Sequence, residues 1–396
     1  LTGVKIKEGV KCIEDDAFKK CVRLRRINIP STVSKLPDHF NPAQWKKIRI
    51  SENNPYYSHD GETYIDLARK CLLQVETEKE EYYVPENVKV IGDHVFYEKE
   101  IKYVELPEGV THIGDFAFYD CSLWRGIKLP ATIDFIGKRA FCETGLYDVE
   151  IPDGIVSIEK YLFSGAHNLR RITIPEGVTH IDEYAFCRCN YLKEIILPGT
   201  LKRIERGAFE GCGRLSSVVF PEGLISIGDN AFRQCSSLTS ITLPGSLESI
   251  GESAFDECTE VKSLNLNEGL IIIGEIYQCG KNSINIPSTV CEMPRKLNDD
   301  MWNKLVISKD NPHYYFDGES YIDLDRKCLL QVRTKKSEYV LPEFVTSIAY
   351  AAFCQQNSLT SVKLHEGLKS IYKSSFDNCK KLTNIELPEG TIVYEP

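Results

Sequence analysis

Fifteen cysteines are the residues of this 396-residue chain that could most readily act as metal ligands, disulfide partners or nucleophiles. A disulfide between neighbours such as Cys212 and Cys235 is possible, but Cys187-x-Cys189 lacks the second ligand pair of a zinc site. Free cysteine is among the most frequently buried residue types, so a regular spacing favours a ladder of small buried side chains. Seven cysteines have that spacing, each three residues after a phenylalanine: Cys21, Cys121, Cys189, Cys212, Cys235, Cys258 and Cys379.

Histidine transfers protons near neutral pH, and the chain has eight histidines at scattered positions. Only His112 and His180 share a position in the repeat described below, and three stacked strands would separate them by about 15 Å. His59 has Phe316 at the matching position of a duplicated segment. The chain also lacks the His-Glu-x-x-His, Gly-x-Ser-x-Gly and phosphate-loop patterns. We therefore predict that the protein is not an enzyme and uses no metal or cofactor.

The elements that would position these residues come from an internal repeat. A strand-like segment ending in Leu-Pro or Ile-Pro recurs every 22 or 23 residues, and the frame continues through Asn267 and His365, where proline is missing. Proline cannot donate to a strand ladder, so it marks the point where each strand ends. The clearest prolines of the series are Pro107, Pro130, Pro152, Pro175, Pro198, Pro221 and Pro244.

Each repeat unit, which we call a rung, closes with alternating apolar and polar residues. This alternation is typical of a strand with one buried face. The Glu-x-x-Ala-Phe segment between strands is too short for a long helix, so we expect a single helical or 3₁₀ turn there. One rung buries too little surface to fold alone, whereas stacked rungs cover one another. Sixteen rung endings from Pro30 to Pro388 predict a leucine-rich-repeat type of solenoid about 75 Å long.

Two longer segments, residues 31–85 and 288–342, are copies offset by 257 positions. Arg69-Lys70-Cys71-Leu72-Leu73-Gln74-Val75, for example, recurs unchanged at residues 326–332. Each copy contains Asp-Gly, at 60–61 and 317–318, between alternating segments, which is a strong signal for a hairpin. We expect a projecting β-hairpin at each place, about 50 Å apart along the axis. No loop has the composition of a linker, so we predict one domain over residues 1–396.

Charge and hydropathy exclude two classes of partner. A net charge of −9 leaves no basic field for a run of phosphates, so nucleic acid is excluded. The longest strongly apolar stretch, near Leu270–Ile273, is far below the roughly 20 residues of a membrane helix, so we expect no membrane-spanning segment. The chain opens at Leu1 without a charged-then-apolar leader, so no signal peptide is visible.

The unit Leu-Pro-Glu-Gly-Val-Thr-x-Ile-(Gly/Asp)-x-x-Ala-Phe-x-x-Cys-x-x-Leu-x-x-Ile-x-Leu-Pro resembles the BspA-like leucine-rich repeat over essentially the whole chain. Leu106–Val110 and Phe220–Leu224 are clear instances, and the Asn-Pro-x-Tyr…Asp-Gly-x-x-Tyr insertion is similar to the family's longer repeat. The resemblance implies a right-handed β-rich superhelix, usually exported by bacteria and displayed at or near the cell surface, with adhesion as the proposed role. This sequence departs from the pattern at Asn267, His365, the short rung 268–287, Gln356 and Ala166.

Stacking aligns equivalent outward positions of the rungs into rows, and solenoid proteins bind partners through such rows. In the middle rungs the residues four and two positions before the rung proline are mostly uncharged, which favours a partner site over a solvated face. Serine and threonine are also ordinary residues for a neutral sheet surface, which is the alternative. The candidate binding residues are Glu194, Ile196, Ser217, Val219, Ser240, Thr242, Ser263 and Asn265.

A second candidate surface is the pair of hairpins, which are rich in tyrosine. Two weak sites on one rigid rod could bind a repetitive partner with avidity. Alternatively, the tyrosines pack each hairpin onto its own rung. The residues concerned are Tyr56, Tyr57, Tyr64, Tyr314, Tyr315 and Tyr321.

Together these features predict a non-catalytic, monomeric adhesion protein, extracellular or at the cell surface. It would engage a protein or glycan of a host or neighbouring cell through its sheet face. A structural spacer that holds another module, or a carbohydrate-active accessory enzyme, are the alternatives. A spacer would bind no ligand, and an enzyme would need clustered carboxylates or a nucleophile–base pair, which the repeat rows do not supply.

Overall fold

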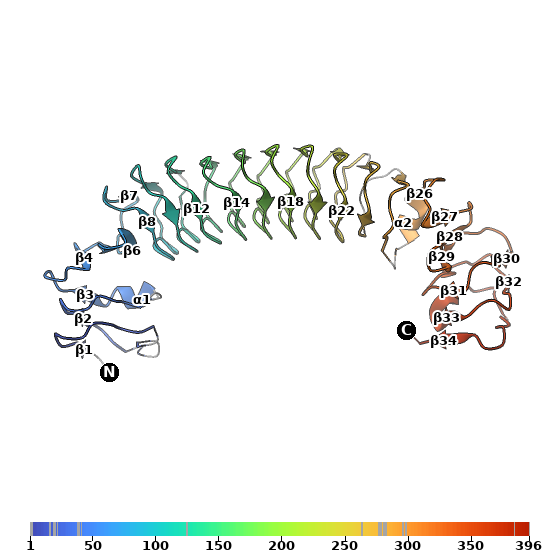
Figure 1. Ribbon diagram of the computed structural model, residues 1–396, viewed down its shortest axis with the longest axis horizontal. Helices are drawn as coiled ribbons and strands as arrows, with labels where there is room; N and C mark the ends of the chain where they lie inside the picture. Colours follow the sequence, from blue (N-terminus) through green and yellow to red (C-terminus); the bar gives the residue numbers. More distant parts are fainter. Residues whose placement is uncertain are drawn as a thin grey trace.

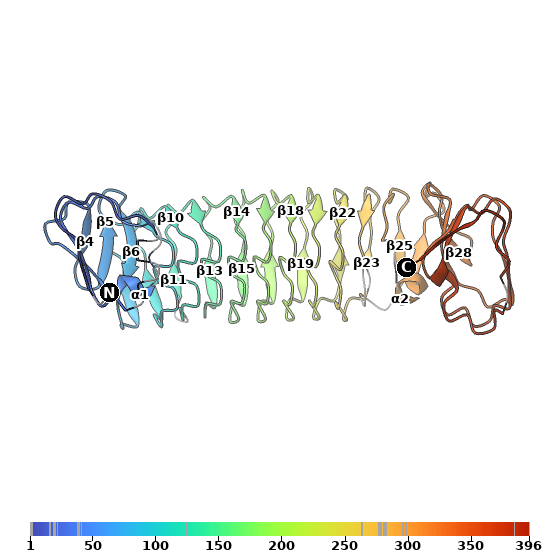
Figure 2. The ribbon, with the colours of Figure 1, turned by 90° about the horizontal axis from the view of Figure 1, so that it is seen from below.

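The computed structural model describes residues 3–15, 17, 18, 21, 23–37, 40, 42–123, 126–262, 264–275, 279, 283–294, 297, 299–383 and 385–395. The chain forms a solenoid of about sixteen turns, as the repeat predicts. The solenoid is an arch whose two ends bend toward the same side (Figure 1). Seen from below, the middle rungs stack in a straight row (Figure 2).

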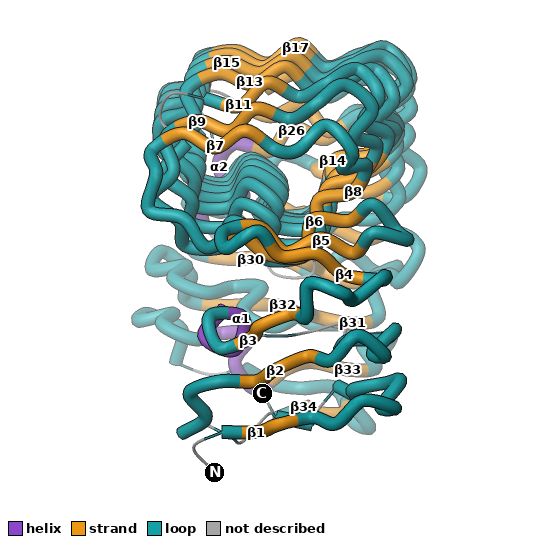
Figure 3. Tube along the Cα trace, turned by 90° about the vertical axis from the view of Figure 1, so that its left-hand side faces the viewer, coloured by secondary structure: helices purple, strands orange, loops and turns teal. Residues whose placement is uncertain are grey.

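The first row of strands lies just before the rung prolines, and we call the surface that it forms the outer sheet. Its strands pair in parallel, with Ile196 beside Val219 in the register, and they follow the convex side of the arch (Figure 3). The strands are β1 (Val4–Lys5), β2 (Ile27–Ile29), β3 (Ile48–Ile50), β7 (Glu81–Tyr83), β9 (Tyr103–Glu105), β11 (Ile127–Lys128), β13 (Asp148–Glu150), β15 (Arg171–Thr173), β17 (Glu194–Ile196), β19 (Ser217–Val219), β21 (Ile241–Thr242), β23 (Leu264–Asn265), β25 (Ile284–Ile286), β26 (Leu305–Ile307), β30 (Glu338–Val340) and β32 (Ser361–Lys363).

A second row of strands, which we call the side sheet, follows the first corner of each rung and was not predicted. These strands are short because a rung turns again after two or three residues, and they also pair in parallel. They are β8 (Val90–Ile91), β10 (His112–Ile113), β12 (Phe135–Ile136), β14 (Ser157–Ile158), β16 (His180–Ile181), β18 (Arg203–Ile204), β20 (Ser226–Ile227), β22 (Ser249–Ile250), β24 (Ile272–Ile273), β31 (Ser347–Ile348), β33 (Ser370–Tyr372) and β34 (Ile392–Tyr394).

The third side of the rung agrees only in part with the prediction of a single helical or 3₁₀ turn in the Ala-Phe segments. Tyr184 and Arg188 have φ of 57° and 59°, and residues in the left-handed region recur four positions apart in other rungs. Such residues turn the peptide groups along the solenoid axis, so Phe186 N–H donates to Ala208 O of the next rung at 2.8 Å. Alternating N–H groups bond within the rung, as Ala185 N–H does to Asp182 O at 3.2 Å. Among the described residues, a 3₁₀-helix occurs at η1 (Lys373–Phe376).

The core follows the repeat phenylalanines, which form one continuous stack. Neighbouring ring centroids lie 4.7–5.7 Å apart, with nearly parallel planes. The small alanine that precedes most of these phenylalanines is also fully buried, which leaves room for the ring of the next rung. The fully buried rings of the stack are Phe96, Phe118, Phe141, Phe163, Phe186, Phe209, Phe232 and Phe255.

The two duplicated segments form antiparallel hairpins, but these are built into the side sheet and do not project from it. Strands β4 (Tyr57–His59), β5 (Thr63–Asp66) and β6 (Cys71–Val75) pair antiparallel and then continue into β8. In the second copy β27 (Tyr314–Phe316), β28 (Ser320–Asp323) and β29 (Cys328–Val332) do the same. All residues of β5 and β28 are buried, which a projecting hairpin would not allow.

The arch bends at these hairpins. The register shifts between Tyr64 and Ile65 and between Tyr321 and Ile322, and such β-bulges bend a strand and increase its twist. The apolar core is divided at the same two places, into clusters that meet at β5 and β28. Helices α1 (Pro42–Trp45) and α2 (Asp299–Lys304) precede β3 and β26 in the rungs next to the bends.

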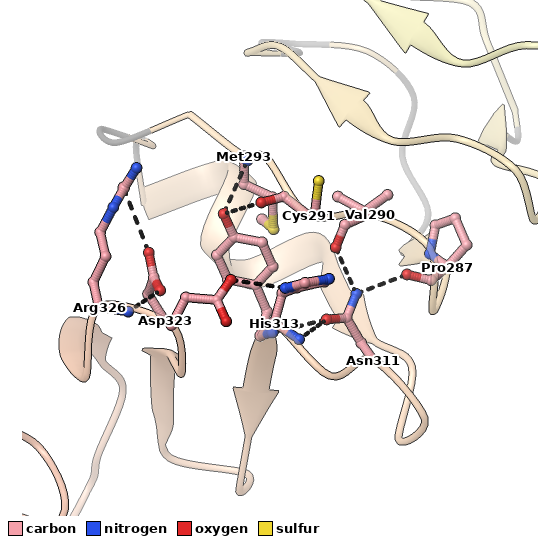
Figure 4. A network of polar contacts seen from close by, with 10 residues as sticks. Pro287, Val290, Cys291, Met293, Asn311, His313, Asp323 and Arg326 are labelled. Carbon is pink, nitrogen blue, oxygen red and sulfur yellow. Dashed lines mark hydrogen bonds and ion pairs between the residues drawn. The ribbon is translucent and has the colours of Figure 1, made fainter.

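A buried asparagine anchors the start of each long rung. Asn311 Nδ2 donates to the carbonyl oxygens of Pro287 and Val290 at 2.9 and 3.0 Å. Its Oδ1 accepts from the N–H groups of His313 and Tyr314 at 2.8 and 2.7 Å (Figure 4). The amide therefore uses both donors and both acceptor sites, which explains why an asparagine precedes the proline here.

Candidate functional site

The cysteines of the repeat are a structural ladder, as their spacing predicts. Cys121, Cys189, Cys212, Cys235 and Cys258 are fully buried, and all fifteen cysteines are free thiols in the structure. In the middle rungs each thiol donates to the carbonyl oxygen of the repeat phenylalanine in the preceding rung. The Cys212 thiol, for example, donates to Phe186 O at 3.1 Å. Burial raises the pKa of Cys121 to about 12 and holds the pKa of Cys235 well above its usual range. Cys121 and Cys235 are therefore poor nucleophiles at neutral pH, because the thiolate is the reactive form.

His59, His112 and His180 make local contacts with neighbouring side chains. His112 stacks on Phe135 with centroids 4.3 Å apart, and His180 Nδ1 lies 3.0 Å from Thr179 Oγ1. His59 stacks on Tyr64 at 3.9 Å, and burial lowers the pKa of its imidazole. Within the part of the chain that the structure describes, no group of three or more His, Cys, Asp or Glu residues could hold a metal ion.

The candidate binding residues on the outer sheet line up as their spacing predicts. The described members are all exposed: Glu194, Ile196, Ser217, Val219, Ser240, Thr242 and Asn265. We call this set the outer strip; Ser263 lies outside the described residues. Ile196 and Val219 are 64% and 80% exposed, although both are large and apolar. Strands β17 and β19 place these two residues side by side, and Thr173 of β15 lies on the other side of Ile196.

The hairpin tyrosines divide into two groups. Tyr57, Tyr64, Tyr314 and Tyr321 are buried, and Tyr64 Oη donates to Ile48 O at 3.0 Å. These four pack each hairpin onto the adjacent rung, which supports the packing alternative for them, and Tyr57 also lines the cleft described below. Tyr56 and Tyr315 are 38% and 46% exposed.

Sequence reasoning missed a cleft at the N-terminal bend. It has a volume of about 1380 Å³ and is lined by residues of the first rungs, the first hairpin rung, β8 and β10. Trp45, Asp93 and Phe116 are among its lining residues. No pattern in the sequence brings these segments together, because the bend between them depends on the bulge in β5.

The structure contains no helix, within its described residues, of the length and apolar character needed to cross a membrane.

Comparisons with known proteins agree with this architecture. The family model described as "BspA type Leucine rich repeat region (6 copies)" matches residues 1–59, 75–193, 179–300 and 328–395. A leucine-rich repeat protein from Bacteroides ovatus ATCC 8483 superposes with a TM-score of 0.53 and 23% identity, over 86% of this chain and 88% of its own. One from Eubacterium ventriosum ATCC 27560 has a TM-score of 0.50 and 26% identity, over 55% of this chain and 60% of its own, less than two thirds of that protein. No curated protein matches the chain.

Proposed function

This chain belongs to the BspA-type leucine-rich repeat family, and from that premise we propose that it is a non-catalytic binding protein that engages a protein or glycan through its outer strip. We further propose that it acts outside the cell or at the cell surface, where proteins that resemble it are usually displayed. The observation that carries the proposal is the exposed pair Ile196 and Val219 on adjacent strands.

The chemistry of the outer strip supports this role. Water is displaced from apolar surface at a gain of roughly 25 cal/mol per Å², so exposed isoleucine and valine side chains are suited to a partner. Ser217, Ser240 and Thr242 are exposed beside them and can exchange hydrogen bonds with polar groups of that partner. A rigid ladder pre-organises these groups, so binding requires little ordering of the protein.

The hypothesis is tested by binding the purified chain to an array of extracellular-matrix proteins and glycans. A variant with Val219→Arg and Ser240→Arg is assayed alongside, because it adds charge to the strip without touching buried side chains. We expect a specific signal from the native chain that the variant loses. Retained binding by the variant would reject the outer strip as the site, and silence of the native chain across the array would favour the spacer alternative.

A further inference from the structure

The corner at which each rung enters the outer sheet carries three exposed cations in the middle of the solenoid. Arg170 and Lys193 come directly before strands β15 and β17, and Arg214 lies in the next rung, three residues before β19. We call these three residues the cationic corner. Their strands stack side by side in the straight part of the molecule (Figure 2). The structure describes every residue from 126 to 262, so all side chains of these rungs are accounted for.

Arg170 and Lys193 occupy equivalent positions of neighbouring rungs. The Lys193 N–H donates to Arg170 O at 2.9 Å, so the two residues are stacked directly. Neighbouring strands of such a ladder lie about 4.8 Å apart, and like charges at that spacing repel each other. The next two rungs carry Ser216 and Thr239 at the same position. The fold therefore does not require cations there, and a bound anion would relieve their repulsion.

The carboxylates beside the corner have cationic neighbours of their own. Arg171 lies between Asp148 and Glu194 in the register of β13, β15 and β17, so the signs alternate in that row. His167 Nε2 lies 3.2 Å from Glu143 Oε2. Within these fully described rungs, no carboxylate forms an ion pair with a member of the cationic corner. Arg171 and the cationic corner hold four positive charges against these three carboxylates, so the local charge is positive although the chain carries −9.

Tyrosine rings hold the two guanidinium groups of the corner in place. Arg170 Cζ lies 5.3 Å from the ring centroid of Tyr147, and Arg214 Cζ lies 4.0 Å from that of Tyr191. Such stacking occupies the face of a guanidinium and leaves the N–H groups at its edge available to an acceptor. Tyr147 and Tyr191 are themselves 41% and 39% exposed. The corner therefore offers oriented donors beside partly exposed aromatic surface.

We propose that the cationic corner binds an anionic polysaccharide, whose sulfate or carboxylate groups accept hydrogen bonds from Arg170, Lys193 and Arg214. Arginine can donate to such a group through two parallel N–H bonds, which makes the contact strong and directional. The sugar rings between the anionic groups carry hydroxyl groups and C–H faces, which suit the exposed parts of Tyr147 and Tyr191. This surface adjoins the outer strip and does not depend on it.

Two other polyanions fit the corner less well. An extended acidic polypeptide repeats its side chains on one face every two residues, or about 6.6 Å, whereas the rungs repeat at about 4.8 Å. A nucleic acid presents an unbroken run of phosphates, and three cations neutralise only a short part of it. Both polymers are therefore included in the test.

The probes are short, fluorescein-labelled chains of dextran sulfate and of polygalacturonate, which carry sulfate and carboxylate groups respectively, with neutral dextran as the reference. Fluorescence anisotropy with the full chain at 25 to 200 mM NaCl shows which anionic group is bound. We expect Arg170→Gln and Lys193→Gln each to weaken binding of the preferred probe about threefold at low salt, and the double variant about tenfold. Arg170→Lys keeps the charge but loses the planar donor fork, so it should restore only part of the affinity.

The matched control is Lys202→Gln, which removes the charge of another exposed lysine in the same part of the solenoid, directly before β18 of the side sheet. Equal effects of the Lys193 and Lys202 variants, or no binding of either anionic probe at 25 mM NaCl, would overturn the proposal. So would binding of polyglutamate or a DNA duplex as tight as that of the preferred polysaccharide. Val219→Arg should not weaken polysaccharide binding, which separates the cationic corner from the outer strip.

Discussion

Asn54 and Asn311 make the same four hydrogen bonds at the same point of the two bends. Asn54 Nδ2 donates to Pro30 O and Val33 O at 2.9 and 3.1 Å, and its Oδ1 accepts the N–H groups of Tyr56 and Tyr57. Each asparagine ties the beginning of a long rung to the corner of the rung before it. The bends therefore contain buried polar contacts as well as an apolar core.

Asn54→Ala should lower the free energy of unfolding by about 3 kcal/mol, since it leaves two carbonyl oxygens and two N–H groups without their partner. Urea denaturation followed by tryptophan fluorescence measures this loss. Asn53→Ala is the control, because Asn53 is exposed and adjacent. Similar urea midpoints for the two variants would show that the buried amide does not stabilise the bend.

Tyr64→Ala should destabilise the protein by about 3–5 kcal/mol, as expected when a large buried ring is removed from a core. Tyr64 is 1% exposed and packs against Trp45 with centroids 5.1 Å apart. Tyr56→Ala should cost clearly less, about 1 kcal/mol, because Tyr56 is 38% exposed and is not part of the core. Thermal melts of the two variants check the difference, and a small effect at Tyr64 would contradict its place in the core.

Thiol titration tests the cysteine ladder. We expect most of the fifteen cysteines to react in the denatured, unreduced protein, and the five fully buried ones to react slowly in the native protein. Exposed Cys291 should react quickly in both states and serves as the internal standard. If only about one thiol reacted in the denatured protein, the remaining cysteines would be paired in disulfides, which would contradict the ladder of free thiols.

Stability should fall at alkaline pH because of the buried thiols. The pKa of Cys121 rises from 9.0 to about 12 and that of Cys279 to about 12, in both cases through burial. A raised pKa in the folded state means that the unfolded state loses these protons first, so the stabilisation is complete below pH 9 and is lost between about pH 9 and 12. Urea midpoints between pH 7 and 11 measure the trend. Cys121→Ala should show a shallower fall than the native chain or Cys291→Ala, and equal slopes would contradict this cause.

Local chemistry explains which parts of the fold the sequence predicts. The rung register follows from Pro175, Pro198 and their equivalents, because proline cannot continue a strand, and Asp60-Gly61 predicts its turn because both residues tolerate positive φ. The Ala-Phe side was predicted only in part, since nothing in the identity of Tyr184 or Arg188 indicates a left-handed backbone. That conformation arises from hydrogen bonds between rungs, which a single repeat does not contain.

The outer strip could be predicted from the sequence, whereas the cleft at the N-terminal bend could not. Outward positions such as Ile196 and Val219 follow from period-two alternation, and their exposure agrees with it. The cleft joins residues as far apart in the chain as Asp15 and Phe135. It depends on the angle that the bulge at Tyr64 and Ile65 introduces, and alternation carries no information about that angle.

The most direct test of the central claim is the dissociation constant of the strongest array ligand for two matched variants, Val219→Arg and Val340→Arg. Both valines lie two residues before a rung proline on the outer sheet and are 80% and 62% exposed, but only Val219 belongs to the outer strip. We predict at least a tenfold weaker affinity for Val219→Arg, equivalent to about 1.4 kcal/mol, and an affinity within about twofold of the native chain for Val340→Arg. Equal affinities for the two variants would contradict binding through the outer strip.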